Sequence, residues 1–110
     1  MGNAIPIPAQ YRHLARQLAA IGFLTKGSVF ERKAGQQGSR YVWTRKVKAK
    51  TVTVALSKEQ YHALRKAARN QRQLEATVAA MQRLSRQILF HKLTGVTRRK
   101  RLSKKVLGLI

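Results

Sequence analysis

Apolar residues in the first quarter of the chain repeat with a helical period. Their steps of three and four residues place them on one face of a short amphipathic helix, which we predict over residues 9–22. Gly22 is a residue type that commonly ends a helix. Ahead of the helix, the prolines of Ile5-Pro6-Ile7-Pro8 disfavour helix in the residues before them and predict an extended lead-in. The apolar face consists of Tyr11, Leu14, Leu18 and Ile21.

The pattern changes to a period of two in the next block, residues 27–56. β-branched and aromatic residues alternate there with polar ones, which is typical of strands, and glycines mark a loop between them. In the last strand the alternation predicts one buried face, formed by Val52, Val54 and Leu56. We expect three antiparallel strands, or two with an irregular edge. The predicted segments are strands over 27–33, 40–47 and 51–56, a loop over 34–39 and a turn over 48–50.

A second helical pattern runs from residue 57 to residue 94. Ser57 and Gln60 have the spacing of a capping box, in which each side chain binds the backbone N–H of the other residue. No Gly or Pro follows until Gly95, and a helix of ~35 residues would be ~50 Å long. Such a helix cannot bury its whole apolar stripe on a small β-block. It is expected either to break near residues 70–73 and fold back as an α-hairpin, or to pair its distal half with another helix in a parallel or antiparallel dimer.

These patterns together predict an α+β protein. It has a short N-terminal helix, a small antiparallel β-hairpin or three-stranded sheet, a long C-terminal helix and a basic tail. We expect residues 1–94 to form a single small α+β domain and residues 95–110 to form a basic C-terminal arm. In isolation the basic run of the arm is expected to be disordered or weakly helical, and its short apolar end could dock on a core or on a partner.

Charge links this fold to a class of partner. The 110 residues include 24 Lys or Arg and 3 Asp or Glu, for a formal net charge of +21. The charge is spread along the chain, with +7 in residues 26–50, +5 in residues 51–90 and +7 in residues 91–110. A chain of this kind repels itself unless a polyanion neutralises it. Nucleic acid is the commonest such partner, since release of its condensed cations favours binding. An anionic membrane and an acidic protein are the alternatives.

Composition argues against catalysis and against metal binding. The chain has no Cys, and its three carboxylates are scattered: Glu31, Glu59 and Glu75. Two-metal chemistry needs convergent carboxylates, and tetrahedral zinc needs four well-placed donors. The histidines lie far apart in the sequence, at His13, His62 and His91. No glycine-rich phosphate loop is visible. We therefore expect no enzymatic activity, no metal and no cofactor.

The sequence also bears on where the protein works. No apolar run approaches the roughly 18 residues that a membrane span requires. The segment Met1–Ala9 carries no basic residue ahead of its apolar stretch, unlike a secretory signal. We expect a cytoplasmic protein without a membrane partner, associated with the nucleoid or held in a nucleoprotein complex.

Three groups of cations are candidates for phosphate contacts. The first surrounds the predicted hairpin and consists of Arg40, Arg45, Lys46, Lys48 and Lys50. The second forms a stripe on the long helix, for which a solvated helix face is the alternative, and consists of Arg65, Arg69 and Arg72. The third is the densest cluster of the arm, for which a solubilising tail is the alternative, and consists of Arg98, Arg99, Lys100, Arg101, Lys104 and Lys105.

Two aromatic residues lie among the hairpin cations. Tyr41 and Trp43 are candidates for base stacking, because rings interleaved with cations on a small sheet suit single-stranded nucleic acid. The alternative for Trp43 is a core position, which is common for the only tryptophan of a small domain. A two-stranded ribbon can also enter a DNA groove, so the mode of binding stays open at this point.

Several blocks of the chain resemble a small bacterial domain family of unknown function, whose members occur as short open reading frames near transposases or labelled as transposases. The resemblance covers roughly Leu24 to Leu89, and the Trp-Thr-Arg-Lys block is its most specific part. Two features depart from the family: the loop Ala34–Ser39 lacks the usual cysteine cluster, and Ala49 replaces the usual glycine of a turn. A family metal site therefore cannot be carried over. The resembling blocks are Gly27-Ser28, Tyr41–Val47, Lys50–Val54, Leu56–Gln60 and Asn70–Glu75.

The sequence thus predicts a non-enzymatic nucleic-acid-binding protein that contacts the phosphate backbone, with DNA favoured over RNA. The resemblance implies an accessory role in a mobile element or phage. One alternative is an RNA-binding structural subunit of a ribonucleoprotein. Another is an oligomerisation or adaptor protein, which would use the long helix to form a homodimer or to bind an acidic protein partner.

Overall fold

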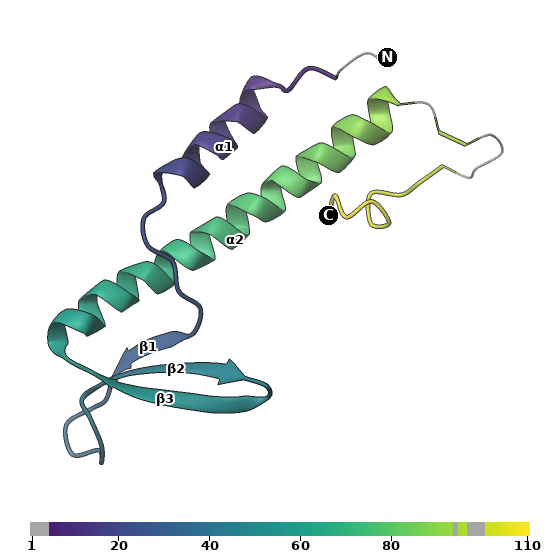
Figure 1. The fold of residues 1–110 in the computed structure, drawn as a ribbon. Coiled ribbons are helices and arrows are strands. Elements are labelled where there is room, and N and C mark those ends of the chain that lie inside the picture. Colours follow the sequence, from purple (N-terminus) through teal and green to yellow (C-terminus); the bar gives the residue numbers. More distant parts are fainter. Residues whose placement is uncertain (1–4, 94, 97–100) are drawn as a thin grey trace. The chain divides into compact units, whose positions relative to one another are not determined.

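A computed structural model describes residues 5–93, 95–96 and 101–110 of the chain. Its elements follow the predicted order, and the predicted α+β fold is confirmed (Figure 1). The chain divides into two compact units, which are described separately below. The sheet unit comprises residues 21–74, and the terminal unit comprises residues up to 20 together with residues from 75 onward. The single domain over residues 1–94 stays a prediction. The elements are α1 (Ala9–Ala20), β1 (Ser28–Glu31), β2 (Tyr41–Val47), β3 (Lys50–Leu56) and α2 (Lys58–Lys92).

The sheet unit contains a three-stranded antiparallel sheet in the order β1-β2-β3. The register sets three strands side by side at Phe30, Val42 and Ala55, and the next row is formed by Val29, Trp43 and Val54 on the opposite face. Val42, in the central strand, is 1% exposed and is the most deeply buried side chain of the described residues. Because β1 pairs with β2 in regular register, the alternative of two strands with an irregular edge is wrong.

The predicted buried face of β3 is wrong in part. Leu56 is half-buried, but Val52 and Val54 are 37% and 38% exposed. Alternation of apolar and polar residues determines which side chains share a face of a strand. It does not determine whether another element covers that face along its full length, and at Val52 and Val54 the cover is incomplete.

The turn between β2 and β3 has a strained backbone. Val47 pairs with Lys50, so the loop consists of two residues, Lys48 and Ala49. Both have positive φ, 50° and 67°, which is the conformation of a type I′ hairpin turn. The left-handed region costs a non-glycine residue about 1–2 kcal/mol, and Asn-Gly or Gly-Gly is the usual solution.

Replacing Ala49 with glycine should therefore stabilise the sheet unit. Relief of the left-handed strain exceeds the entropy that glycine gains in the unfolded chain, about 0.5–1 kcal/mol. We expect a net gain of about 0.5–1 kcal/mol, seen as a rise of a few degrees in Tm. Ala55→Gly in strand β3 is the control and should lower Tm, since glycine weakens a strand interior. A fall in Tm for Ala49→Gly would show that the backbone at Ala49 is not strained.

The capping box at the start of α2 is confirmed. The backbone N–H of Ser57 donates to Oε1 of Gln60 at 3.0 Å, and the backbone N–H of Gln60 donates to Oγ of Ser57 at 3.1 Å. Two of the N–H groups at this end of the chain's longest helix are thus satisfied locally.

The predicted break near residues 70–73 does not occur, because α2 is helical from Lys58 to Lys92. Asn70, at the start of this segment, donates from Nδ2 to the carbonyl of Phe23 at 3.0 Å. The backbone N–H of Thr25 donates to the carbonyl of Ala67 at 3.3 Å, so the segment before β1 lies directly against the helix. Ala67 and its neighbour Ala68 are both 5% exposed. Their small side chains permit this close approach of backbone to helix.

The terminal unit contains α1 and the distal part of α2. The predicted apolar face of α1 is half-buried at Tyr11, Leu14 and Leu18, while the other residues of the helix are exposed. The apolar end of the predicted arm docks on α2. The half-buried Arg86 donates from Nε to the carbonyl of Leu107 at 2.5 Å and from one terminal nitrogen to the carbonyl of Gly108 at 3.2 Å. Within the described residues, neither helix is both long and apolar enough to cross a membrane.

Candidate nucleic-acid interface

The hairpin of β2 and β3 extends past β1. Strand β1 pairs with β2 only from Tyr41 to Thr44, whereas the pairing of β2 with β3 continues to Val47 (Figure 1). Residues 45–52 therefore form a two-stranded segment with a two-residue turn at its tip, which we call the ribbon. Its cross-strand pairs are Arg45 with Val52, Lys46 with Thr51 and Val47 with Lys50.

The ribbon concentrates positive charge on a regular backbone. It carries four cations and no carboxylate, and all four are exposed. The β-ladder fixes their spacing, since residues on adjacent strands lie about 5 Å apart and alternate between the two faces. The structure thus brings together four of the five hairpin candidates: Arg45, Lys46, Lys48 and Lys50.

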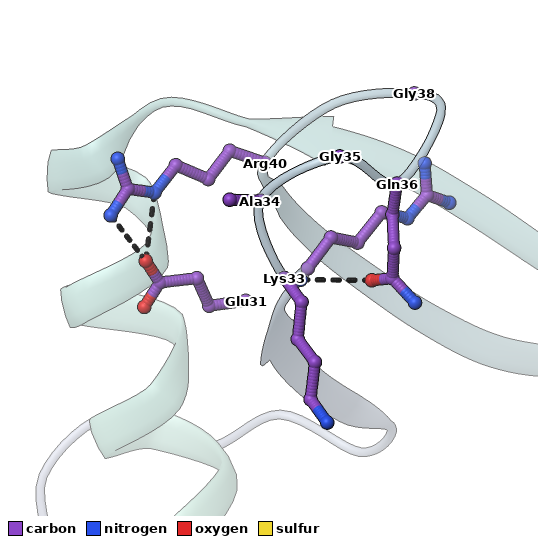
Figure 2. A pocket seen from close by; sticks show the side chains of 8 residues that line it. Glu31, Lys33, Ala34, Gly35, Gln36, Gly38 and Arg40 are labelled. Atoms are coloured by element: carbon purple, nitrogen blue, oxygen red, sulfur yellow. Dashed lines mark hydrogen bonds and ion pairs between the residues drawn. The ribbon is translucent and has the colours of Figure 1, made fainter.

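Arg40, the fifth hairpin candidate, lies elsewhere and already has a partner. It precedes Tyr41 at the end of β2 opposite the ribbon. Its guanidinium donates from Nε to Oε1 of Glu31 at 2.7 Å, and a second nitrogen lies 2.7 Å from the same oxygen (Figure 2). This hydrogen bond, together with the charges of Tyr41 and Glu31, raises the pKa of Arg40 above its ordinary value. Any anionic ligand would therefore have to displace Glu31 from Arg40.

Removing the Glu31 carboxylate should release Arg40. We expect Glu31→Gln to steepen the dependence of DNA affinity on salt by up to about 0.9 in a double-logarithmic plot, the contribution of one added phosphate contact. Fluorescence anisotropy of a labelled duplex over a salt series measures this slope. Glu59→Gln, in the first turn of α2, makes the same change in net charge and serves as the control. Equal steepening in both variants would show that Arg40 gains no contact of its own.

The loop between β1 and β2 holds two further cations that sequence reasoning missed as candidates. Arg32 and Lys33 line an open pocket of about 450 Å³ with Arg40 and Glu31. The guanidinium of Arg32 donates to the carbonyl of Gln37 at 2.8 Å, and Lys33 points away from the Glu31–Arg40 pair (Figure 2). The sequence pattern had assigned both residues to the first strand. Because β1 ends at Glu31, they belong to the loop.

The two aromatic candidates of β2 both have partners inside the sheet unit. The ring centroids of Tyr41 and Tyr61 lie 4.6 Å apart. The guanidinium of Arg40 lies 5.4 Å from the centroid of the Tyr41 ring. The indole N–H of Trp43 donates to the carbonyl of Lys26 at 3.0 Å, and the guanidinium of Arg45 lies 5.4 Å from the Trp43 ring centroid. Both side chains are half-buried. These contacts favour structural roles for the two rings.

A left-handed glycine makes the Trp43 hydrogen bond possible. Gly27 has φ of 109°, and a side chain there would collide with the carbonyl of Thr44 and would come within 2.7 Å of the indole nitrogen of Trp43. Glycine lets the chain turn just before β1 so that Lys26 reaches the indole. A larger residue at this position would disturb the start of β1 and the packing of Trp43 together.

The helical stripe is exposed as predicted. Arg65, Arg69 and Arg72 follow one another at steps of four and three residues on α2. Arg65 also contacts Tyr61, with one guanidinium nitrogen 3.4 Å from the phenolic oxygen and the guanidinium carbon 5.8 Å from the ring centroid. Arg69 and Arg72 remain candidates for phosphate contacts, and the solvated helix face remains the alternative.

The basic arm belongs to the terminal unit. Arg98, Arg99 and Lys100 lie outside the described residues. Arg101, Lys104 and Lys105 are exposed, and the backbone around them includes a hydrogen bond from Leu109 N to the carbonyl of Lys104 at 2.8 Å. The described part of the arm thus presents cations to solvent while its apolar end contacts α2.

No group of three or more potential metal ligands occurs among the described histidines and carboxylates. Comparisons with protein-family models, curated proteins and solved structures gave no match. The resemblance to the transposase-associated family therefore stays a hypothesis.

Proposed function

We propose that this chain is a non-enzymatic nucleic-acid-binding protein that contacts the phosphate backbone, with DNA favoured over RNA. The ribbon is the observation that supports this best: four exposed cations, with no carboxylate between them, are held on a two-stranded β-segment. An accessory role in the DNA transactions of a mobile element or phage is the proposed setting, which rests on the sequence resemblance.

The charge balance of the whole sheet unit, ribbon included, also supports the proposal. The sheet unit carries 13 Lys or Arg against Glu31 and Glu59, a net charge of +11. Internal pairing cannot neutralise this excess, and in the described residues every Lys and Arg is exposed except the half-buried Arg32 and Arg86. A bound polyanion would neutralise this positive charge, and release of its condensed counterions would favour association.

The decisive experiment is a salt series. Purified full-length chain, freed of nucleic acid, is titrated into a fluorescently labelled oligonucleotide, and anisotropy gives the affinity. Four phosphate contacts predict a loss of at least about 100-fold between ~50 and ~200 mM salt. If no oligonucleotide binds at low salt, the proposal is wrong.

The same titration separates the alternative functions. An RNA duplex of matched sequence tests the ribonucleoprotein subunit, which should bind RNA more tightly than DNA. Poly-glutamate tests the adaptor for an acidic protein, which should bind the polypeptide and ignore both nucleic acids. If the proposed function is right, the affinity for the DNA duplex depends more steeply on salt than the affinity for the RNA duplex or for poly-glutamate.

A further inference from the structure

The two faces of the ribbon differ in chemistry. One face carries Lys46 and Thr51, and continues into the three-stranded part of the sheet as the cross-strand row Ser28, Thr44 and Thr53 and then as the row Phe30, Val42 and Ala55, where Val42 is buried. Lys46, Thr51, Thr53 and Ser28 are exposed, and Thr44 is half-buried. We call this the hydroxyl face. The opposite face carries Arg45 with Val52, followed by Val29, Trp43 and Val54.

The opposite face is poorly suited to hold unpaired bases. Its large ring, Trp43, is held by the carbonyl of Lys26 and flanked by Arg45. The ring of Tyr41, farther along β2, packs against Tyr61. Single-strand binding commonly uses aromatic rings on which successive bases stack, and neither ring of β2 is free to serve in this way.

The hydroxyl face suits the edges of paired bases. Hydroxyl groups both donate and accept hydrogen bonds, and a lysine ammonium binds the acceptors of guanine, so such a face matches the groups exposed in the major groove. The groove of B-form DNA is about 12 Å wide and admits a two-stranded ribbon, whose strands lie about 4.8 Å apart. The major groove of A-form RNA is too deep and narrow for this.

We propose that the ribbon enters the major groove of double-stranded B-form DNA with its hydroxyl face toward the base edges. In this arrangement Lys46 and Thr51 reach into the groove, and Lys48 and Lys50 at the tip contact flanking phosphates. The inference rests on the proposed function and specifies its ligand as duplex DNA.

The first test compares three ligands of one sequence: a DNA duplex, its single strand and the matching RNA duplex. Full-length chain is titrated into each at the same low salt concentration, and the emission of Trp43, the chain's one tryptophan, is recorded in parallel. We expect the DNA duplex to bind at least tenfold more tightly than the other two. Equal or tighter binding of the single strand, with strong quenching of Trp43, overturns the inference but leaves nucleic-acid binding intact. Equal or tighter binding of the RNA duplex has the same meaning, whereas absence of all binding overturns both proposals.

The second test separates the two faces with near-isosteric exchanges. Thr51→Val with Thr53→Val removes two hydroxyls from the hydroxyl face, and Val52→Thr with Val54→Thr adds two to the opposite face. All four side chains are exposed, so both variants should keep the sheet, which Tm and Trp43 emission check. We expect the first variant to lose about tenfold in affinity for the DNA duplex and the second to stay within twofold. An unchanged affinity of the first variant, or a larger loss in the second, overturns the inference.

Discussion

Replacing all four ribbon cations with alanine is expected to weaken DNA binding at least 100-fold near ~50 mM salt and to flatten the salt dependence by about 2–4 units. The variant is Arg45→Ala, Lys46→Ala, Lys48→Ala and Lys50→Ala. Each phosphate contact contributes roughly 0.9 to the slope, so loss of the Lys48 and Lys50 contacts alone removes about 2 units, and phosphate contacts by all four cations would remove about 4. Anisotropy titrations at several salt concentrations measure both quantities.

A matched control distinguishes local contacts from net charge. Four exposed cations of the terminal unit that are not interface candidates supply it: Arg12, Arg16, Arg83 and Lys92. Their replacement with alanine removes the same formal charge. We expect this variant to keep most of the slope, because the proposed phosphate contacts are made by the ribbon and not by these four residues. The same flattening in both variants would mean that binding is spread over the chain and that the ribbon is not the site.

The largest expected change in stability follows from Tyr61→Ala. Tyr61 is 7% exposed, and its ring packs 4.6 Å from Tyr41 and 5.2 Å from His62 between ring centroids. Truncation of a buried aromatic residue leaves a cavity and costs about 3–5 kcal/mol. This is a large share of the 5–15 kcal/mol that stabilises a typical domain. Urea unfolding followed by Trp43 emission reports the sheet unit directly.

The conservative exchange Tyr61→Phe serves as the control. It keeps the ring and its contacts and removes only the phenolic oxygen, 3.4 Å from a guanidinium nitrogen of Arg65. Since this hydrogen bond is long and only partly buried, we expect a loss below about 1 kcal/mol. If both variants lost stability equally, the phenolic hydroxyl of Tyr61 rather than the packing of its ring against Tyr41 would account for the loss.

Local signals in the sequence predicted the elements well. Ser57 and Gln60 placed the start of α2 correctly, because a capping box depends on residues only three positions apart. The first helix ends at Ala20, two residues before the predicted boundary, and the long helix ends at Lys92 instead of residue 94. Helix ends commonly differ by this amount.

Features that depend on distant residues could not be predicted. The break near residues 70–73 was expected because so long a helix cannot bury its apolar stripe on a small β-block, yet the side chain of Asn70 in this segment binds the carbonyl of Phe23, 47 residues away. The exposure of Val54 depends on how much of the sheet face is covered, which alternation along one strand does not reveal. These are properties of the packed sheet unit.

In the candidate interface, too, local signals predicted some features and contacts between distant residues determined the others. The ribbon cations followed from their position beside a predicted turn, and the structure places them on one two-stranded segment. Arg40 was grouped with them by closeness in sequence, but the sheet register brings it to Glu31 at the other end of β2. Arg32 and Lys33 were missed as candidates because the hairpin cations were grouped around Tyr41 and Trp43, beyond the predicted loop.

The uncharged capping box has a bearing on behaviour in acid. Many helices begin with a carboxylate cap, which weakens when it takes up a proton. In this chain the partners are the hydroxyl of Ser57 and the amide of Gln60, and neither gains a proton at moderately low pH. The first turn of α2, next to the sheet, should thus keep its capping hydrogen bonds in mildly acidic solution.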